Sequence, residues 1–181
     1  IENSDLFKLS PFKALTQDQA IAVEDILDGL FQDLRAGVGS TAVIQGQPGT
    51  GKTIIAIFLM KMLADIRDYD IDDEQDSDSI FSEFFVPDNR ELLRDFRMAL
   101  VVPQQSLRLS IQRVFEKTPK LSASMVLSPF DVGKASDDFG LLIVDESHRL
   151  SQRANQSSGM LNRDFAEINK KLYGLDDATK T

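Results

Sequence analysis

The run GQPGTGKT at residues 46–53 constrains the fold of this chain more than any other feature. It fits the pattern of glycine, four residues, and then glycine, lysine and serine or threonine that binds nucleotide phosphates. A short β-branched run, TAVIQ at residues 41–45, precedes it, and the apolar run KTIIAIFLMKML with helical spacing follows it. This context predicts a strand, a phosphate-binding loop and a helix in succession, and disfavours an ordinary glycine-rich turn.

Each fixed position of this loop has a chemical role. Gly46, Gly49 and Gly51 are expected to adopt positive φ, so that backbone N–H groups surround a β-phosphate at the positive end of the helix. Lys52 is expected to contact the β- and γ-phosphates, and the hydroxyl of Thr53 to bind Mg²⁺. The predicted nucleotide-binding residues of the loop are Gly46, Gln47, Pro48, Gly49, Thr50, Gly51, Lys52 and Thr53.

A candidate metal site lies in LLIVDESH, residues 141–148. The four apolar residues predict a strand buried on both faces of a parallel sheet, and the two acids follow at its carboxyl end, where open α/β sheets bind ligands. Asp145 is expected to hold Mg²⁺ through water, and Glu146 to polarise the water that attacks the γ-phosphate. Such a pair is otherwise often a solvated turn or a helix start, so this interpretation depends on the upstream loop.

The remaining segments predict strands and helices in alternation. Residues 97–115 predict a strand, a loop and a helix, and residues 122–133 predict another strand followed by a turn. Alternation of this kind indicates an α/β fold with a parallel sheet and helices on both faces. Residues 80–96 form two short amphipathic pieces split by Pro87, whose apolar stripe of Ile80, Phe81, Phe84 and Phe85 is expected to cover a core. Residues 159–174 predict one further helix.

Composition limits the class of protein. The chain has 181 residues, 42% of them apolar, which is enough for one domain with a sizeable core. It has no cysteine, which excludes disulfides, thiolate catalysis and cysteine-bound metals. We see neither a signal peptide nor an apolar run of membrane-spanning length, and therefore expect a cytoplasmic protein.

The formal net charge of −9 argues against a generally basic nucleic-acid-binding surface, although it leaves room for a local one. Much of the acidity lies in DIRDYDIDDEQDSDS, residues 65–79, which has few apolar residues and no periodicity. We expect this segment to be a solvated, mobile insertion.

Taken in order, the motifs resemble those of the helicase-like ATPase family called domain of unknown function 2075, a relative of the superfamily-one helicases. The resemblance runs from Leu15 to near the end of the chain, outside the acidic insertion. Its most specific parts are GQPGTGKT, VVPQQSLRLSIQRVF, ASMVLSPFDV and LLIVDESHRL. It implies a RecA-like P-loop NTPase fold, a three-layer sandwich, that binds ATP and Mg²⁺. Ser147 stands where relatives usually carry alanine, so a small residue is kept.

The resemblance also implies roles for residues outside the loop and the acids. Residues 15–23, LTQDQAIAV, are similar to the helicase glutamine motif, in which Gln19 would read the edge of adenine. Thr16 and Gln19 also fit a capping box for the following helix, and both roles can hold. His148, the only histidine, would link the nucleotide site to the nucleic acid, or would serve as a structural hydrogen-bond donor.

The segment VVPQQSLR occupies the place of helicase motif Ia. The resemblance implies that it contacts the backbone of DNA or RNA, in single-stranded form. The candidate residues are Pro103, Gln104, Gln105, Ser106 and Arg108. An N-capped helix start would explain the same residues equally well.

Helicases also need a second RecA-like half, whose arginine reaches the γ-phosphate. The sequence shows no such half after Glu146, and no β-branched run for a further central strand of the sheet. We therefore expect a fragment of a longer protein that by itself binds nucleotide weakly and hydrolyses it slowly.

Three functions fit these features. The first is the ATP-hydrolysing motor core of a helicase or translocase that acts on DNA or RNA. The second is a nucleotide-gated regulatory or binding module without strand-separating activity. The third, a small-molecule kinase, is disfavoured because kinases of this fold do not usually place a water-polarising glutamate at the acidic strand end.

Overall fold

The computed structural model of this protein describes residues 15–47, 49–70, 80–136 and 138–147. The predictions for Pro48, for His148, for the helix at residues 159–174 and for residues 71–79 of the acidic segment lie outside the described residues. The chain divides into two compact units, one made of Ile1–Phe96 with Lys117–Leu121 and the other of Arg97–Glu116 with Ser122–Thr181.

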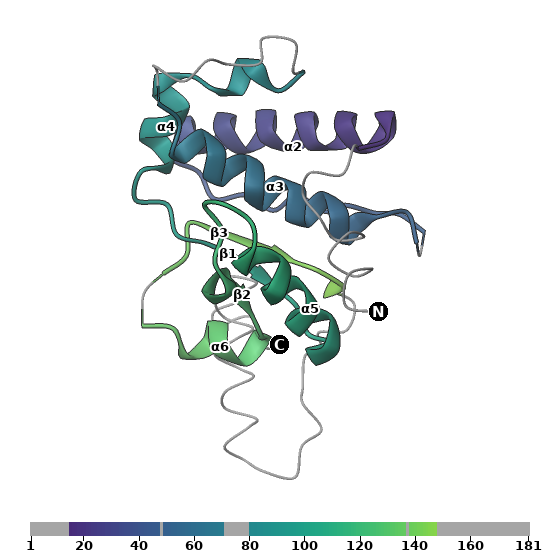
Figure 1. The fold of residues 1–181 in the computed structure, drawn as a ribbon. Coiled ribbons are helices and arrows are strands. Elements are labelled where there is room, and N and C mark those ends of the chain that lie inside the picture. The colour runs from purple at the N-terminus through teal and green to yellow at the C-terminus, as the bar shows by residue number, and fades with distance from the viewer. Residues whose placement is uncertain (1–14, 48, 71–79, 137, 148–181) are drawn as a thin grey trace, which may run out of the picture. The chain divides into compact units, whose positions relative to one another are not determined.

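The first unit is helical in its described part. Its elements are α2 (Gln17–Ala36), α3 (Lys52–Arg67), the 3-10 helix η1 (Ser82–Phe84) and α4 (Pro87–Leu93). The helices α2, α3 and α4 pack against one another (Figure 1). α2 begins after the capping residue Thr16 and ends at Gly37, whose φ of +65° is the left-handed conformation that glycine adopts at many helix ends.

The core of this unit is apolar and rich in aromatic rings. Helical spacing places three residues of α2 in the core: Val23, Leu27 and Phe31. Phe31 stacks on Phe84, with ring centroids 6.1 Å apart, and Phe81 is buried as well. Phe81 and Phe84 therefore cover a core as predicted. Ile80 does not, since it is 58% exposed and precedes the helical turn that gives the stripe its spacing.

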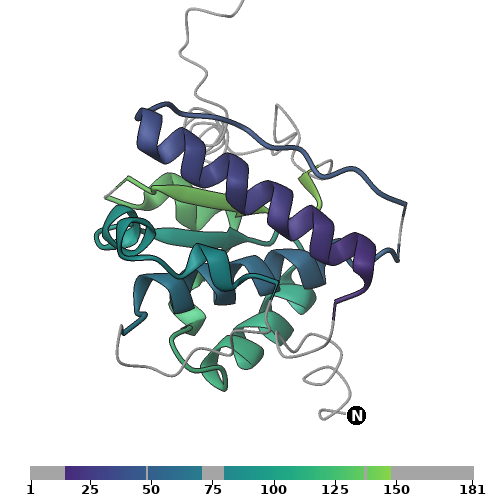
Figure 2. The same cartoon turned by 90° about the horizontal axis from the view of Figure 1, so that it is seen from above.

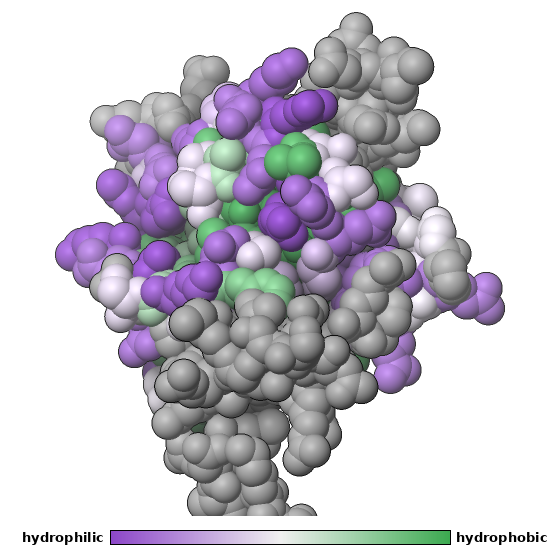
Figure 3. All heavy atoms as spheres, turned by 90° about the horizontal axis from the view of Figure 1, so that it is seen from below, coloured by the Kyte–Doolittle hydropathy of each residue, from purple (hydrophilic) through white to green (hydrophobic). Residues whose placement is uncertain are grey.

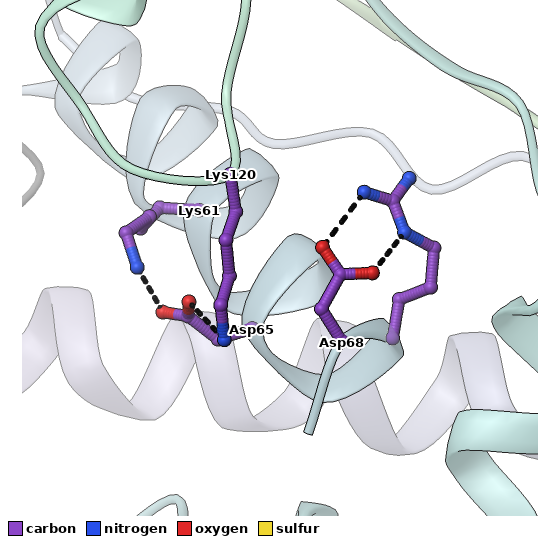
Figure 4. A network of polar contacts seen from close by, with 5 residues as sticks. Lys61, Asp65, Asp68 and Lys120 are labelled. Carbon is purple, nitrogen blue, oxygen red and sulfur yellow. Dashed lines mark hydrogen bonds and ion pairs between the residues drawn. The ribbon is translucent and has the colours of Figure 1, made fainter. Parts of the chain in front are cut away.

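Ion pairs surround the C-terminal half of α3. Asp65 accepts a hydrogen bond from Lys61 one turn earlier, and Lys120 approaches its other oxygen at 3.5 Å (Figure 4). The Arg67 guanidinium donates to both oxygens of Asp68, at 2.9 and 3.2 Å. These bonds hold the pKa of Asp68 below its usual range, although partial burial opposes the shift. α3 thus continues to Arg67, into the segment predicted to be a mobile insertion.

Residues 38–47 have no regular secondary structure and run beside α2 back toward its N-terminal end (Figure 2). The prediction of a strand at residues 41–45 is therefore wrong. β-branching favours a strand only where the backbone also has a neighbour to pair with, and none of the described strands pairs with these residues. Val43 and Ile44 are accordingly 74% and 39% exposed.

The second unit contains an open sheet of three parallel strands. β1 (Met98–Val101), β2 (Val126–Leu127) and β3 (Leu141–Val144) lie in the order β2-β1-β3. The connections are formed by α5 (Gln105–Glu116), the 3-10 helix η2 (Ala123–Met125) and α6 (Pro129–Lys134). The described fold is therefore α/β with a parallel sheet and flanking helices, which agrees with the RecA-like class.

The strands of this sheet differ in burial. All residues of β1 are buried because a strand lies on each side of it. The apolar residues of β3 are only half-buried, so the prediction of burial on both faces is wrong. The reason is position, since β3 lies at an edge of the described sheet.

The described surface is mainly hydrophilic in the view from below, where hydrophobic residues show between hydrophilic ones (Figure 3). Among the helices that the structure describes, none combines the length and the apolar character that crossing a membrane requires.

Candidate nucleotide-binding site

The phosphate loop leads into α3, whose first residue is Lys52. Gly49 and Gly51 have φ of +83° and +86°, in the left-handed region that side chains disfavour. Gly46 is not among the glycines with positive φ, so the prediction for its backbone is wrong. Its lack of a side chain matters for space instead, because a Cβ there would lie 2.9 Å from Oγ1 of Thr50.

The ammonium group of Lys52 lies against the loop. It donates hydrogen bonds to the carbonyl oxygens of Gly46 and Gln47, at 2.8 and 2.9 Å. The hydroxyl of Thr50 donates to the same oxygen of Gln47, at 2.9 Å. The first turn of α3 contains no acidic residue, so no acid there offsets the positive charge of Lys52 and of the helix end. A phosphate group fits this set of donors.

Gln19 connects the start of α2 to the loop. Its Oε1 accepts from the backbone N of Thr16 at 3.0 Å, and Oγ1 of Thr16 accepts from the backbone N of Gln19 at 3.3 Å, which confirms the capping box. Its Nε2 donates to the carbonyl oxygen of Thr50 at 3.0 Å. The sequence does not predict this last contact, because no local pattern relates residues that are 31 positions apart.

Asp145 and Glu146 follow β3 in the second unit. Asp145 is 7% exposed, and its backbone N–H donates to the carbonyl oxygen of Val101 at 3.0 Å, which continues the pairing of β3 with β1. Its Oδ1 accepts from the backbone N of Glu146 at 3.0 Å. The two acids therefore stand at the carboxyl end of the strand, as predicted.

The backbone of Glu146 is strained. Its φ is +50°, a left-handed conformation that costs a residue with a side chain roughly 1–3 kcal/mol. Such strain gathers at functional sites, where the surrounding structure holds it. The Oε2 atom is buried and accepts no hydrogen bond within the described residues, although Glu146 has other interactions.

In the first unit, the hydroxyl of Thr53 at the start of α3 is an oxygen donor of the kind that binds Mg²⁺, and in the second unit the carboxylate of Asp145 is another. Both are oxygen ligands, which Mg²⁺ prefers, and one carboxylate is a common protein contribution because the ion keeps several waters. No group of three His, Cys, Asp or Glu side chains forms in the ranges that the structure describes.

The segment from Pro103 to Arg108 follows β1 and Val102, and its start lies at the same end of the parallel sheet as Asp145. Arg108 donates to the carbonyl oxygen of Val102 at 2.8 Å and so holds the turn between β1 and α5. Gln104 donates to the hydroxyl of Ser106 at 3.1 Å, and the side chains at positions 104–106 are exposed. Positions 104–106 of this segment thus present exposed polar groups, whereas Arg108 has a structural role.

The strand β2 is followed by the helix α6, where the sequence predicted only a turn. Ser128 and Asp131 form a capping box, in which the Asp131 carboxylate accepts from the Ser128 N at 2.9 Å and Ser128 Oγ accepts from the Asp131 N at 3.2 Å. Burial alone would raise the pKa of Asp131, but the bonds from Ser128 and the charges of Arg108 and Lys134 together lower it.

A comparison with protein families gives a match over most of the chain. The family model described as "Schlafen group 3, DNA/RNA helicase domain" matches residues 39–172, which is more than half of the chain. The chain belongs to this family. No curated protein and no solved structure matches it significantly.

Membership of the Schlafen group 3 helicase-domain family confirms the resemblance to helicases at the level of a helicase-related domain. The narrower relation to domain of unknown function 2075 stays a prediction. The match includes the phosphate loop, Asp145 and Glu146, but it begins after α2, so Gln19 lies outside it.

Proposed function

We propose that this chain is the ATP-binding and ATP-hydrolysing motor core of a helicase-like or translocase protein that acts on DNA or RNA. The observation that carries the proposal is the loop at the start of α3, where the ammonium group of Lys52 lies against the carbonyl oxygens of Gly46 and Gln47 and where Gly49 and Gly51 have left-handed conformations. A nucleotide phosphate is the ligand that this cation and these backbone donors suit best. The family's description as a DNA/RNA helicase domain supports the nucleic-acid part.

In the proposed complex, Lys52 replaces its bonds to two loop carbonyls by bonds to the β- and γ-phosphates. The replacement is favourable because hydrogen bonds between charged partners are stronger than bonds to neutral carbonyls. Thr53 and, through water, Asp145 are the residues that would hold Mg²⁺, which neutralises phosphate charge when bound.

Glu146 is the proposed general base. Its carboxylate accepts a proton from water while the water oxygen attacks the γ-phosphorus and the bond to the β-phosphate oxygen breaks, which yields ADP and phosphate. The left-handed backbone turns Glu146 out of the regular strand, and the bond from its N–H to Asp145 holds that turn.

The proposed nucleic-acid contact is the segment Pro103 to Arg108. Its exposed amide and hydroxyl groups at positions 104–106 suit hydrogen bonds to phosphate and sugar, which position a strand without reading its sequence. A link between the two ligands through His148 remains part of the proposal, and adenine recognition remains one candidate role of Gln19.

The test is the steady-state ATPase rate of the intact protein with single-stranded DNA, with single-stranded RNA and with neither. We expect one of the two nucleic acids to raise the rate, and Glu146→Gln to remove the activity in every condition. ATP binding with a rate that neither nucleic acid changes would favour a nucleotide-gated regulatory module instead. A protein that binds no nucleotide would refute both functions.

A further inference from the structure

The side-chain amide of Gln19 bridges α2 and the phosphate loop. Its oxygen accepts from the backbone N of Thr16 and its nitrogen donates to the carbonyl of Thr50, each at 3.0 Å. Because one partner is a donor and the other an acceptor, the amide has a single satisfactory orientation. We propose that Gln19 is a latch that holds the loop in its phosphate-binding conformation, a positioning role that rests on the function proposed above.

The bond to Thr50 fixes one peptide plane of the loop. In a planar trans peptide the carbonyl of Thr50 and the N–H of Gly51 point in opposite directions. With the carbonyl directed at Gln19, the Gly51 N–H is directed to the opposite side of the peptide. Gly51 is the N-cap of α3, so this N–H belongs to the donors at the start of the helix. Rotation of the peptide would replace that donor by a carbonyl oxygen, which repels phosphate.

The same contact explains why residue 51 is a glycine. A Cβ added at Gly51 would overlap with Nε2 of Gln19, so a side chain there would displace the amide. The helix that carries Gln19 is anchored, since Val23, Leu27 and Phe31 of α2 are buried in the core of the first unit. The latch therefore connects the loop to a packed helix through one side chain.

A latch and a base-reading residue affect ligands differently. Loss of the latch disturbs the donors for phosphate, which ATP, GTP and inorganic tripolyphosphate all share. Loss of a base-reading residue weakens only the nucleotide whose base it recognises. Gln19 can make further bonds in addition to the two observed, so the comparison of ligands separates these roles.

Gln19→Glu is the most informative variant. Glutamate has the same length and forms a capping box as well as glutamine does, but it presents an acceptor instead of a donor to the Thr50 carbonyl. We expect the affinities for the Mg²⁺ complexes of ATP, GTP and tripolyphosphate to fall by one common factor of about 10, with little change in the unfolding midpoint.

Thr16→Ala is the matched control. It removes the capping hydroxyl but keeps the backbone N–H that holds Gln19, so we expect lower thermal stability with unchanged ligand affinities. If both variants lowered affinity in proportion to stability, Gln19 would have only a capping role and the latch would be refuted.

Two further outcomes bear on the latch. A loss confined to ATP, with tripolyphosphate bound as before, would show that Gln19 reads the base and would overturn the proposal. If the wild-type protein bound none of the three ligands, the proposed function would fail, but backbone amide exchange at residues 49–52 would still test the latch. Faster exchange in Gln19→Glu supports it, and unchanged exchange refutes it.

Discussion

At the scale of single residues, two adjacent acids have different surroundings. Asp145 is buried at the end of β3, and its carboxylate accepts the backbone N–H of the next residue. Glu146 lies beyond the strand in a left-handed conformation. A carboxylate that accepts a backbone hydrogen bond suits a metal ligand of fixed position, whereas a carboxylate just beyond the strand suits contact with a substrate water.

This difference predicts distinct effects for two isosteric variants. Glu146→Gln should keep MgATP affinity and lower the turnover number by roughly 10²–10⁴-fold, because the proton acceptor is lost while shape is kept. Asp145→Asn should instead weaken nucleotide binding in the presence of Mg²⁺ and have less effect in its absence. Nucleotide titrations with and without Mg²⁺, together with ATPase rates, check both. Normal turnover by Glu146→Gln would refute its role as the base.

At the scale of elements, the strand order β2-β1-β3 makes β1 the centre of the described sheet. Leu100 on β1 is fully buried, whereas Leu142 on the edge strand β3 is half-buried. A leucine buried by neighbours on both sides loses more contacts on truncation than a leucine at an edge, since the cavity left behind cannot close.

We therefore expect Leu100→Ala to lower the free energy of unfolding by about 2–5 kcal/mol. Leu142→Ala is the matched control and should cost clearly less. Urea unfolding of the two variants under the same conditions measures the difference. Equal costs would contradict the central position of β1.

The capping box of α6 predicts how the stability of the protein changes at acidic pH. Burial opposes the charged form of Asp131, but the hydrogen bonds from Ser128 and the charges of Arg108 and Lys134 together outweigh it, so the pKa in the folded protein lies below the unfolded value. The stabilisation is thus present above an unfolded pKa of about 3.9 and is lost as the pH falls through the folded pKa. Asp131→Asn should be less stable than wild type near neutral pH, and the gap should shrink below about pH 4. A gap of equal size in urea unfolding at both pH values would contradict this.

Some of these elements follow from sequence and others do not. The capping box of Thr16 and Gln19 and the start of α3 at Lys52 depend on residues within a few positions, so local patterns predict them. The missing strand at residues 41–45 and the partial burial of β3 depend on which distant segments supply pairing neighbours. The same holds for the bond from Gln19 to Thr50, which no spacing rule contains.

The glycines of the loop also show that local sequence patterns predict some features of the structure and not others. The motif gives their identities, and the positive φ of Gly49 and Gly51 follows from the need to curl the backbone. The requirement at Gly46 is space beside the Thr50 hydroxyl, which depends on how the loop folds back on itself.

At the scale of the whole molecule, the chain is acidic, and a nucleotide is negatively charged as well. The net charge of −9 would repel a polyphosphate at long range, so binding must depend on local donors such as Lys52. We therefore expect nucleotide binding to depend on the phosphate loop.

The most direct test is titration of the intact protein with a fluorescent ATP analogue and Mg²⁺, for wild type, Lys52→Ala and Lys134→Ala. Lys134 is an exposed lysine in the last turn of α6, so its variant matches the change in charge outside the loop. We predict that wild type and Lys134→Ala bind alike and that Lys52→Ala loses binding or weakens it by about 100-fold or more, because the only side-chain cation of the loop is gone. Equal affinity in all three proteins would refute nucleotide binding by this loop.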